Sequence, residues 1–156
     1  MALTLLVTGG TRSGKSNFAE ERARDFGQHL GKRLVYIATA EAFDEEMAAR
    51  IARHQRRRGP EWHTVHAPID LVRAVTQTDG KGPCVIDCLT LWLSNLMLAG
   101  QDTKIAADAL VASLASRTDP VILVTNEVGS GIVPENPLAR RFRDEAGRLN
   151  QIVAQA

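Results

Sequence analysis

The chain has 156 residues, of which 44% are hydrophobic, so it is long enough to form one domain with a substantial core. Its formal net charge of +1 excludes a global electrostatic field that would draw it to nucleic acid or to a membrane surface. The first apolar run is much shorter than a membrane span and follows no basic segment, so we expect neither a signal peptide nor a membrane anchor.

Apolar runs alternate with helical stretches along the chain, without an internal repeat. The expected strands are residues 3–8, 33–38, 62–66, 83–87 and 120–125. The expected helices are residues 15–26, 43–58, 69–77, 89–99, 103–116 and 137–155. Gly27 is expected to end the first helix, and Asn136 with Pro137 to begin the last. Four strands are nearly continuous apolar runs, so the pattern predicts a three-layer α/β domain whose sheet is mostly parallel and covered on both faces.

A phosphate-binding loop is predicted at residues 9–16, where GGTRSGKS matches G-x-x-x-x-G-K-[ST] after an apolar strand. The glycines let backbone N–H groups converge on phosphate oxygens, and the following helix adds the positive end of its dipole. Lys15 would reach the β- and γ-phosphates, and the Ser16 hydroxyl would bind Mg²⁺. The alternative is a glycine turn followed by a chance Lys-Ser pair. The expected nucleotide contacts are Gly9, Gly10, Thr11, Arg12, Ser13, Gly14, Lys15 and Ser16.

The arginine-rich segment comes next along the chain. Five arginines occur within nine residues, namely Arg50, Arg53, Arg56, Arg57 and Arg58. His54 lies beside an apolar stripe of Phe43, Met47 and Ile51, so we expect a partly shielded imidazole that the surrounding positive charge keeps neutral and nucleophilic. The residues alone favour a solvated basic helix with a surface histidine. A nucleic-acid patch is disfavoured because aromatic residues do not alternate with the arginines.

Asp87 ends the fourth apolar strand, where a carboxylate could complete a magnesium site with Ser16. The alternative is a cap on the helix that follows. Cys84 and Cys88, the only cysteines, have no nearby Cys or His partner, so we expect buried free thiols and a reducing, cytoplasmic compartment.

Asn126 and Glu127 follow the fifth strand, at the edge where open α/β sheets bind ligands. Glu127 could act as a base or orient a water, and Asn126 could bind a ligand. Turn formation explains both residues equally well, so the two interpretations stay open. The Gly-Ser-Gly that follows suggests a mobile loop over the site.

Five segments together carry a resemblance to a known family. They are TGGTRSGKS at 8–16, YIATA at 36–40, EMAARIARH at 46–54, DCLT at 87–90 and VTNEVGSGIVPEN at 124–136. Over nearly its whole length the chain resembles the bifunctional adenosylcobinamide kinase / adenosylcobinamide-phosphate guanylyltransferase family of cobalamin biosynthesis. The loop motif is shared by many families, whereas its combination with the segments around residues 54 and 126 is specific.

The resemblance implies one recombinase-like P-loop domain over residues 1–156 and two reactions that use Mg²⁺. The first transfers the γ-phosphoryl group of GTP or ATP to the aminopropanol hydroxyl of adenosylcobinamide. The second transfers GMP from GTP, through a guanylylated His54, to the resulting phosphate and gives adenosylcobinamide-GDP and pyrophosphate. Besides the loop, the implied nucleotide contacts are Thr39, Ala40, Glu41, Gln55, Arg56, Arg57, Arg58 and Asp87. The resemblance also implies a homotrimer with nucleotide sites near subunit boundaries.

Two departures from the family pattern stand out. The sequence stops at Ala156 within a helical pattern, where the family normally adds a strand, so a strand is expected to be missing and one sheet edge to be bare. His66 stands where many relatives carry an acid, and we interpret it as a turn or surface histidine.

Two other functions are compatible with a phosphate-binding loop. A monofunctional P-loop kinase of another small metabolite remains an alternative, whereas a nucleotide switch is disfavoured because no Asn-Lys-x-Asp segment is present.

Overall fold

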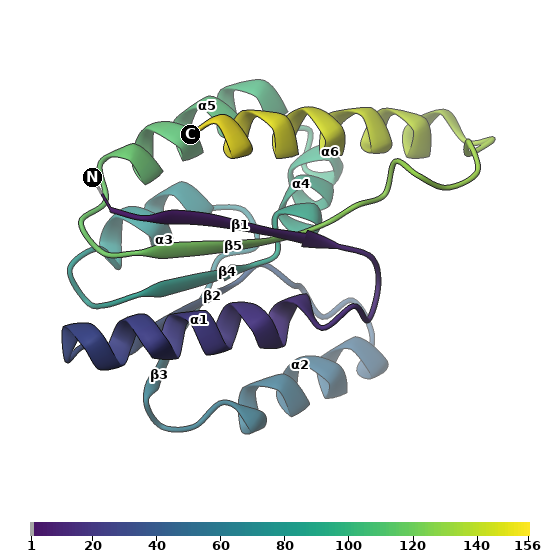
Figure 1. Ribbon diagram of the computed structural model, residues 1–156. Helices are drawn as coiled ribbons and strands as arrows, with labels where there is room; N and C mark the ends of the chain where they lie inside the picture. The colour runs from purple at the N-terminus through teal and green to yellow at the C-terminus, as the bar shows by residue number, and fades with distance from the viewer. Residues whose placement is uncertain (1) are drawn as a thin grey trace.

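Five parallel strands form a single sheet in the middle of the molecule, in the computed structural model that describes residues 2–156 (Figure 1). The strands are β1 (Thr4–Gly9), β2 (Leu34–Ala38), β3 (Trp62–His66), β4 (Cys84–Asp87) and β5 (Val121–Asn126), in the order β1-β5-β4-β2-β3. Every pairing is parallel, as the sequence predicted. All five carboxyl ends therefore meet at one edge of the sheet, where ligands bind in this class of fold.

Helices cover both faces of the sheet. They are α1 (Lys15–Leu30), α2 (Glu45–Arg57), α3 (Leu71–Gln77), α4 (Leu89–Leu98), α5 (Thr103–Ala115) and α6 (Pro137–Gln155). Figure 1 shows α1 and α2 on one face and the other four helices on the opposite face. Alternate residues of the central strands enter two separate cores: Val35 and Ile86 pack with α3 to α6, whereas Tyr36 and Val85 pack with α1. Burial on both faces explains why these strands read as continuous apolar runs.

The predicted strands are confirmed to within a residue at each end, but the first helix differs. Gly27 does not end α1, which continues to Leu30 and ends at Gly31 in the left-handed conformation (φ 63°). A Cβ at Gly27 would lie 2.6 Å from a methyl carbon of Leu34, so this glycine allows the helix to approach the start of β2 closely. The last helix begins as predicted, with the Asn136 side chain accepting hydrogen bonds from the first helical turn.

Helix α2 is the least embedded element. None of its thirteen residues is buried, and Phe43, which was expected to pack, is 74% exposed. The predicted packed stripe is therefore wrong: Met47 and Ile51 are only half-buried and face a pocket rather than a core. A salt bridge from Arg57 to the buried Glu20 of α1, with an N to O distance of 2.9 Å, ties the helix to the body.

Side-chain hydrogen bonds join the chain segments that leave β2 and β4. The buried Thr39 Oγ1 donates to the carbonyl oxygen of Cys88 (2.7 Å) and accepts from the Cys88 N–H (2.8 Å). Asn95 Nδ2 donates to the carbonyl oxygens of Thr39 (2.8 Å) and Pro68 (3.0 Å). These bonds satisfy backbone groups beyond the ends of the strands and hold the segment that carries Asp87.

Strands β1 and β3 form the edges of the sheet, and β1 is partly exposed along its length. Helix α6 is the last element among residues 2–156. Within the same residues, no helix combines the length and apolar character that crossing a bilayer requires. Cys84 and Cys88 are free and buried, as predicted.

Replacement of Thr39 tests this junction. Thr39→Val keeps the shape of the side chain but leaves the buried N–H of Cys88 without its partner and removes one of the two hydrogen bonds to the Cys88 carbonyl, which keeps the bond from the Trp92 N–H, so we expect the free energy of unfolding to fall by about 1–3 kcal/mol. Urea denaturation measures the change. Thr39→Ser retains the hydroxyl and serves as the matched control; equal stability of the two variants would contradict a role for these hydrogen bonds.

Candidate nucleotide site

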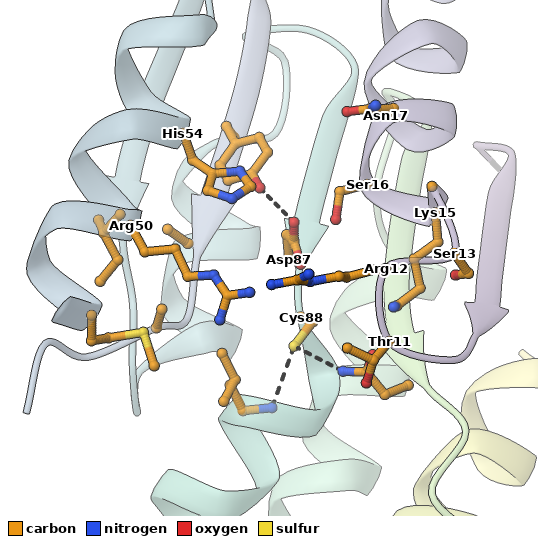
Figure 2. Close-up of a pocket in the computed structure, with 18 of the residues that line it drawn as sticks. Thr11, Arg12, Ser13, Lys15, Ser16, Asn17, Arg50, His54, Asp87 and Cys88 are labelled. Carbon is orange, nitrogen blue, oxygen red and sulfur yellow. Dashed lines mark hydrogen bonds between the residues drawn. The ribbon is translucent and has the colours of Figure 1, made fainter.

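A pocket of about 670 Å³ opens at the carboxyl edge of the sheet. Its walls come from the loop at residues 11–16, from α2, and from the ends of β2, β4 and β5. Figure 2 shows the loop on one side and α2 on the other, with Asp87 between them. The loop, α2 and Asp87, which lie far apart in the sequence and were predicted to contribute to the reaction, therefore line one pocket.

The loop at residues 9–16 has the backbone that phosphate binding requires. Arg12 (φ 54°) and Gly14 (φ 85°) adopt the left-handed conformation, and α1 begins directly afterwards without a side-chain cap in the described structure. Lys15 Nζ donates to the carbonyl oxygen of Gly10 (2.7 Å), so the lysine folds back over the loop. A Cβ on Gly9 would lie 2.7 Å from Ser13 Oγ, so a larger residue there would require the Ser13 side chain to move. The loop thus presents N–H groups, a helix N-terminus and an ammonium group to an anion.

Asp87 is held by a neighbour that the sequence analysis did not single out. Tyr36 on β2 donates its hydroxyl to Asp87 Oδ2 at 2.6 Å (Figure 2). Burial, and to a lesser extent the Asp87 carboxylate, raise the pKa of Tyr36 well above its ordinary value, so the hydroxyl stays a donor. The cap of α4 is Cys88, whose sulfur accepts from the Leu91 N–H, and Asp87 is therefore not the helix cap that was considered as an alternative.

Ser16 and Asp87 both line the pocket and supply one hydroxyl and one carboxylate oxygen. Among residues 2–156, no cluster of three or more His, Cys, Asp or Glu side chains is arranged to hold a metal ion. Mg²⁺ does not need such a cluster, because it is usually bound by one or two protein oxygens together with substrate phosphates and water. This donor set fits Mg²⁺ delivered with a nucleotide.

Helix α2 places Arg50, His54 and Gln55 on the pocket wall. Figure 2 shows the His54 ring and the Arg50 side chain directed into the space that faces the loop. His54 is exposed rather than partly shielded as expected, because the neighbouring Met47 and Ile51 are themselves only half-buried. The imidazole is open to a ligand that occupies the pocket.

Arg58 follows α2 and is the one buried arginine of the segment, with 7% of its surface exposed. Its guanidinium carbon lies 3.5 Å from the centroid of the Tyr36 ring, in a cation–π contact. The Nε and Nη1 groups are buried without a hydrogen-bond partner in the described structure. Arg58 also lines the pocket, so an anionic group of a bound ligand could accept hydrogen bonds from these two donors.

Several predicted contacts do not reach the pocket. Glu41 and Arg56 are exposed and lie outside its lining, and Arg57 pairs with Glu20. The Thr39 hydroxyl bonds to Cys88 and faces away from the lining, whereas Ala40 does line the pocket. Gly9 and Gly10 contribute their backbone to the loop but not to the pocket wall.

The exposed His66 at the end of β3 lies near the pocket through one intermediary. Gln55 Nε2 is 3.1 Å from His66 Nε2, and Gln55 lines the pocket. The interpretation of His66 as a surface residue agrees with its exposure. Its backbone also pairs with that of Ala38, another residue of the pocket wall.

Asn126 and Glu127 both line the pocket. Glu127 also accepts a hydrogen bond from the Gly129 N–H, as a turn residue would, and a role in binding or catalysis stays a prediction for both residues. Cys88, behind them, has a pKa raised to about 11 by burial and, secondarily, by the Asp87 charge. Its thiol therefore stays protonated near neutral pH and is a poor nucleophile.

Sequence reasoning named Arg50 within the basic segment but not as a site residue. Its position four residues before His54, on the same helical face, was the available signal. The sequence indicated Tyr36 less clearly. Tyr36 lies on the same face of the sheet as Val85 and Asp87, and it is the pairing of β2 with β4 that brings these residues together.

Comparisons with known proteins agree with this geometry. The model of the family described as cobinamide kinase / cobinamide phosphate guanyltransferase matches residues 5–156. A bifunctional adenosylcobalamin biosynthesis protein of Pseudomonas aeruginosa is 42% identical over 96% of this chain and 86% of its own length. Proteins with the same description from Salmonella typhimurium and Escherichia coli are each 39% identical over 99% of this chain and 91% of their length.

A solved structure also resembles the fold. The KaiC-like protein of Pyrococcus horikoshii superimposes with a TM-score of 0.55 at 21% identity. The match covers 80% of this chain and 61% of that chain, and it supports the predicted recombinase-like P-loop architecture. The family model and the curated relatives go further than the fold: this chain belongs to the cobinamide kinase / cobinamide phosphate guanyltransferase family.

Proposed function

We propose that this chain catalyses both reactions of its family in the one pocket: phosphorylation of adenosylcobinamide, and transfer of GMP to the phosphate so formed. The observation that carries the proposal is that His54 on α2 and the phosphate-binding loop line the same cavity. His54 would carry the GMP group, and the loop would hold the triphosphate in both reactions. GTP or ATP would serve the first reaction and GTP the second.

In the kinase reaction, the loop N–H groups and the start of α1 would bind the β- and γ-phosphates. Lys15 would leave the Gly10 carbonyl and place its ammonium group on these phosphates. The aminopropanol hydroxyl oxygen of the corrinoid would bond to the γ-phosphorus and lose its proton to solvent, while the bond from that phosphorus to the β–γ bridging oxygen breaks and the nucleoside diphosphate leaves. The protein's contribution is positioning and charge stabilisation.

Ser16 and Asp87 would hold Mg²⁺ through one hydroxyl and one carboxylate oxygen. When bound, the ion would neutralise charge that builds up on the phosphate oxygens. Tyr36 would keep the carboxylate in place through its hydrogen bond to Oδ2, leaving the other oxygen free of this bond.

In the nucleotidyl reaction, a ring nitrogen of neutral His54 would attack the α-phosphorus of GTP. The bond between that phosphorus and the α–β bridging oxygen would break, and pyrophosphate would leave. A phosphate oxygen of adenosylcobinamide phosphate would then attack the same phosphorus, and cleavage of the P–N bond would restore the imidazole. The exposed position of His54 allows both partners to approach.

We further propose a cytoplasmic homotrimer, as the family resemblance implies. The free, buried thiols suit a reducing compartment. Exposed apolar side chains near the pocket suit coverage by another subunit: Ile132 is 98% exposed and Phe43 is 74% exposed. Light scattering of the purified protein would test the assembly, and a monomeric mass at micromolar concentration would exclude a stable trimer.

Lys15→Ala is expected to reduce both half-reactions, because each uses the triphosphate bound on the loop. Removal of one such charge-stabilising group costs about 10²–10³ in rate. Initial rates of corrinoid phosphorylation and of GMP transfer measure the effect. Lys81→Ala removes an exposed lysine outside the pocket and is the matched control. Loss of only one activity in Lys15→Ala would show that the reactions do not share the loop.

His54→Ala is expected to abolish nucleotidyl transfer and to leave phosphoryl transfer within about threefold of wild type, since truncating an exposed side chain has little effect on the fold. Incubation with Mg²⁺ and GTP labelled at the α-phosphate should give an acid-labile, alkali-stable label on wild type and none on the variant.

His63→Ala, which removes an exposed histidine of β3 outside the pocket, should be labelled like wild type. If wild-type protein acquires no label, the two-step transferase is wrong and a monofunctional kinase remains. Equal loss of both activities in His54→Ala would contradict the division of roles.

A further inference from the structure

We propose that Arg50 is a catalytic residue of the nucleotidyl step, and that its guanidinium group binds the non-bridging oxygens of the phosphorus atom that becomes bonded to His54. The inference rests on the proposed function and adds to it a residue that lies before the histidine rather than in the arginine stretch after it. The chemical group that Arg50 recognises is the nucleotidyl phosphate between α2 and the loop, which is linked to pyrophosphate in GTP and to the His54 nitrogen in the intermediate.

The structure sorts the five arginines of the basic segment by what they contact. Arg57 is paired with Glu20, and Arg58 is buried on the Tyr36 ring. Arg53 and Arg56 are exposed and lie outside the pocket. Arg50 lines the pocket and, among residues 2–156, forms no hydrogen bond or ion pair, so its five N–H donors are available to a ligand.

Arg12 of the loop faces Arg50 from the opposite wall. Figure 2 shows the two guanidinium groups directed toward each other across the middle of the pocket. Arg12 likewise forms no ion pair or hydrogen bond in the described structure, and the Asp87 carboxylate, which also lines the pocket, bonds to Tyr36 rather than to either arginine. Two like charges that face each other repel, so the arrangement is stabilised when an anion lies between them. A triphosphate seated on the loop is such an anion.

Helix geometry links Arg50 to His54 rather than to the loop. The two residues are one turn apart on the same face of α2, about 6 Å along the helix axis. Helical side chains lean toward the N-terminus, so the His54 ring leans over the turn that carries Arg50. Because one rigid helix carries both residues, Arg50 stays within reach of any phosphorus atom bonded to the ring, wherever α2 lies relative to the loop.

The proposed role of Arg50 is to stabilise the negative charge on the oxygens of the phosphorus atom during its transfer. As the His54 nitrogen bonds to the α-phosphorus and the bond to pyrophosphate breaks, charge is redistributed over the oxygens of the phosphorus in transfer. A bidentate guanidinium matches two of those oxygens. The same contact would persist in the phosphoramidate and assist attack by the corrinoid phosphate, after which the P–N bond breaks and the imidazole is restored. Phosphoryl transfer at the γ-phosphorus does not use this contact.

Rapid-quench labelling with α-labelled GTP and Mg²⁺ tests the proposal. The rate of label transfer to the protein is measured as a function of GTP concentration, and the kinase rate is measured in the same preparations. Arg50→Ala is expected to lower the labelling rate at saturating GTP by about 10²–10³ and to leave corrinoid phosphorylation at saturating nucleotide within about threefold of wild type, because the γ-phosphorus does not bond to His54. Arg50→Lys keeps the charge but loses the bidentate geometry, so an intermediate rate is expected.

Arg53→Ala is the matched control, because Arg53 is exposed on the same helix, adjacent to His54, and outside the pocket. Its labelling rate should equal that of wild type. An unchanged saturating rate in Arg50→Ala, with or without a higher half-saturating GTP concentration, would overturn the catalytic role, as would an equal loss in Arg53→Ala. Wild-type protein that takes no label would overturn the proposed function itself, and this inference with it.

Discussion

The hydrogen bonds that join the ends of β2 and β4 fix the backbone that carries Asp87 into the pocket. In a parallel sheet the ladder stops at the last residue of each strand, and the chain beyond has unsatisfied backbone groups. Here Thr39 and Asn95 supply the missing partners, and the Cys88 sulfur caps α4. With the backbone fixed on both sides of Asp87, its carboxylate can be directed at the loop by one further bond, from Tyr36.

Tyr36 also connects this junction to α2. Its hydroxyl donates to Asp87 while its ring lies under the Arg58 guanidinium, so the residue after α2 and the carboxylate at the end of β4 share one aromatic side chain. Two further polar contacts link α2 to the body: the Arg57 to Glu20 salt bridge and the hydrogen bond between Gln55 and His66. A helix held by polar contacts near its C-terminal end, with no residue in either core, gains little stability from burial. Its apolar residues Met47 and Ile51 are instead available to line the pocket.

The sequence predicted those features that depend on local pattern. Continuous apolar runs identified the strands because β2, β4 and β5 are buried on both faces, and the loop motif was recognisable because it requires glycines at fixed spacing. Gly27 was misread, since a glycine within a helix can serve close packing against Leu34 as well as chain termination.

The composition of the pocket wall was less predictable, because it depends on tertiary contacts. All five arginines looked equivalent in the sequence, yet a buried acid on α1 pairs with Arg57 and an aromatic ring on β2 contacts Arg58. Helical periodicity placed Met47 and Ile51 on one face correctly but could not show whether that face meets a core or a cavity. The family resemblance identified His54, and the tertiary structure adds that it shares a wall with Arg50.

The exposure of His54 is better understood as a requirement of the proposed chemistry than as a departure from it. Two nucleophiles must reach one phosphorus atom in succession: the imidazole first, then a phosphate on a bulky corrinoid. An imidazole shielded by core packing would serve the first attack and obstruct the second. A helix that stands on the rim of the pocket solves this problem, because the ring is reachable from the loop side by the triphosphate and from the open side by the acceptor. The phosphate-binding loop can then remain unchanged between the two reactions, and the choice between the γ- and α-phosphorus is made by which nucleophile is presented.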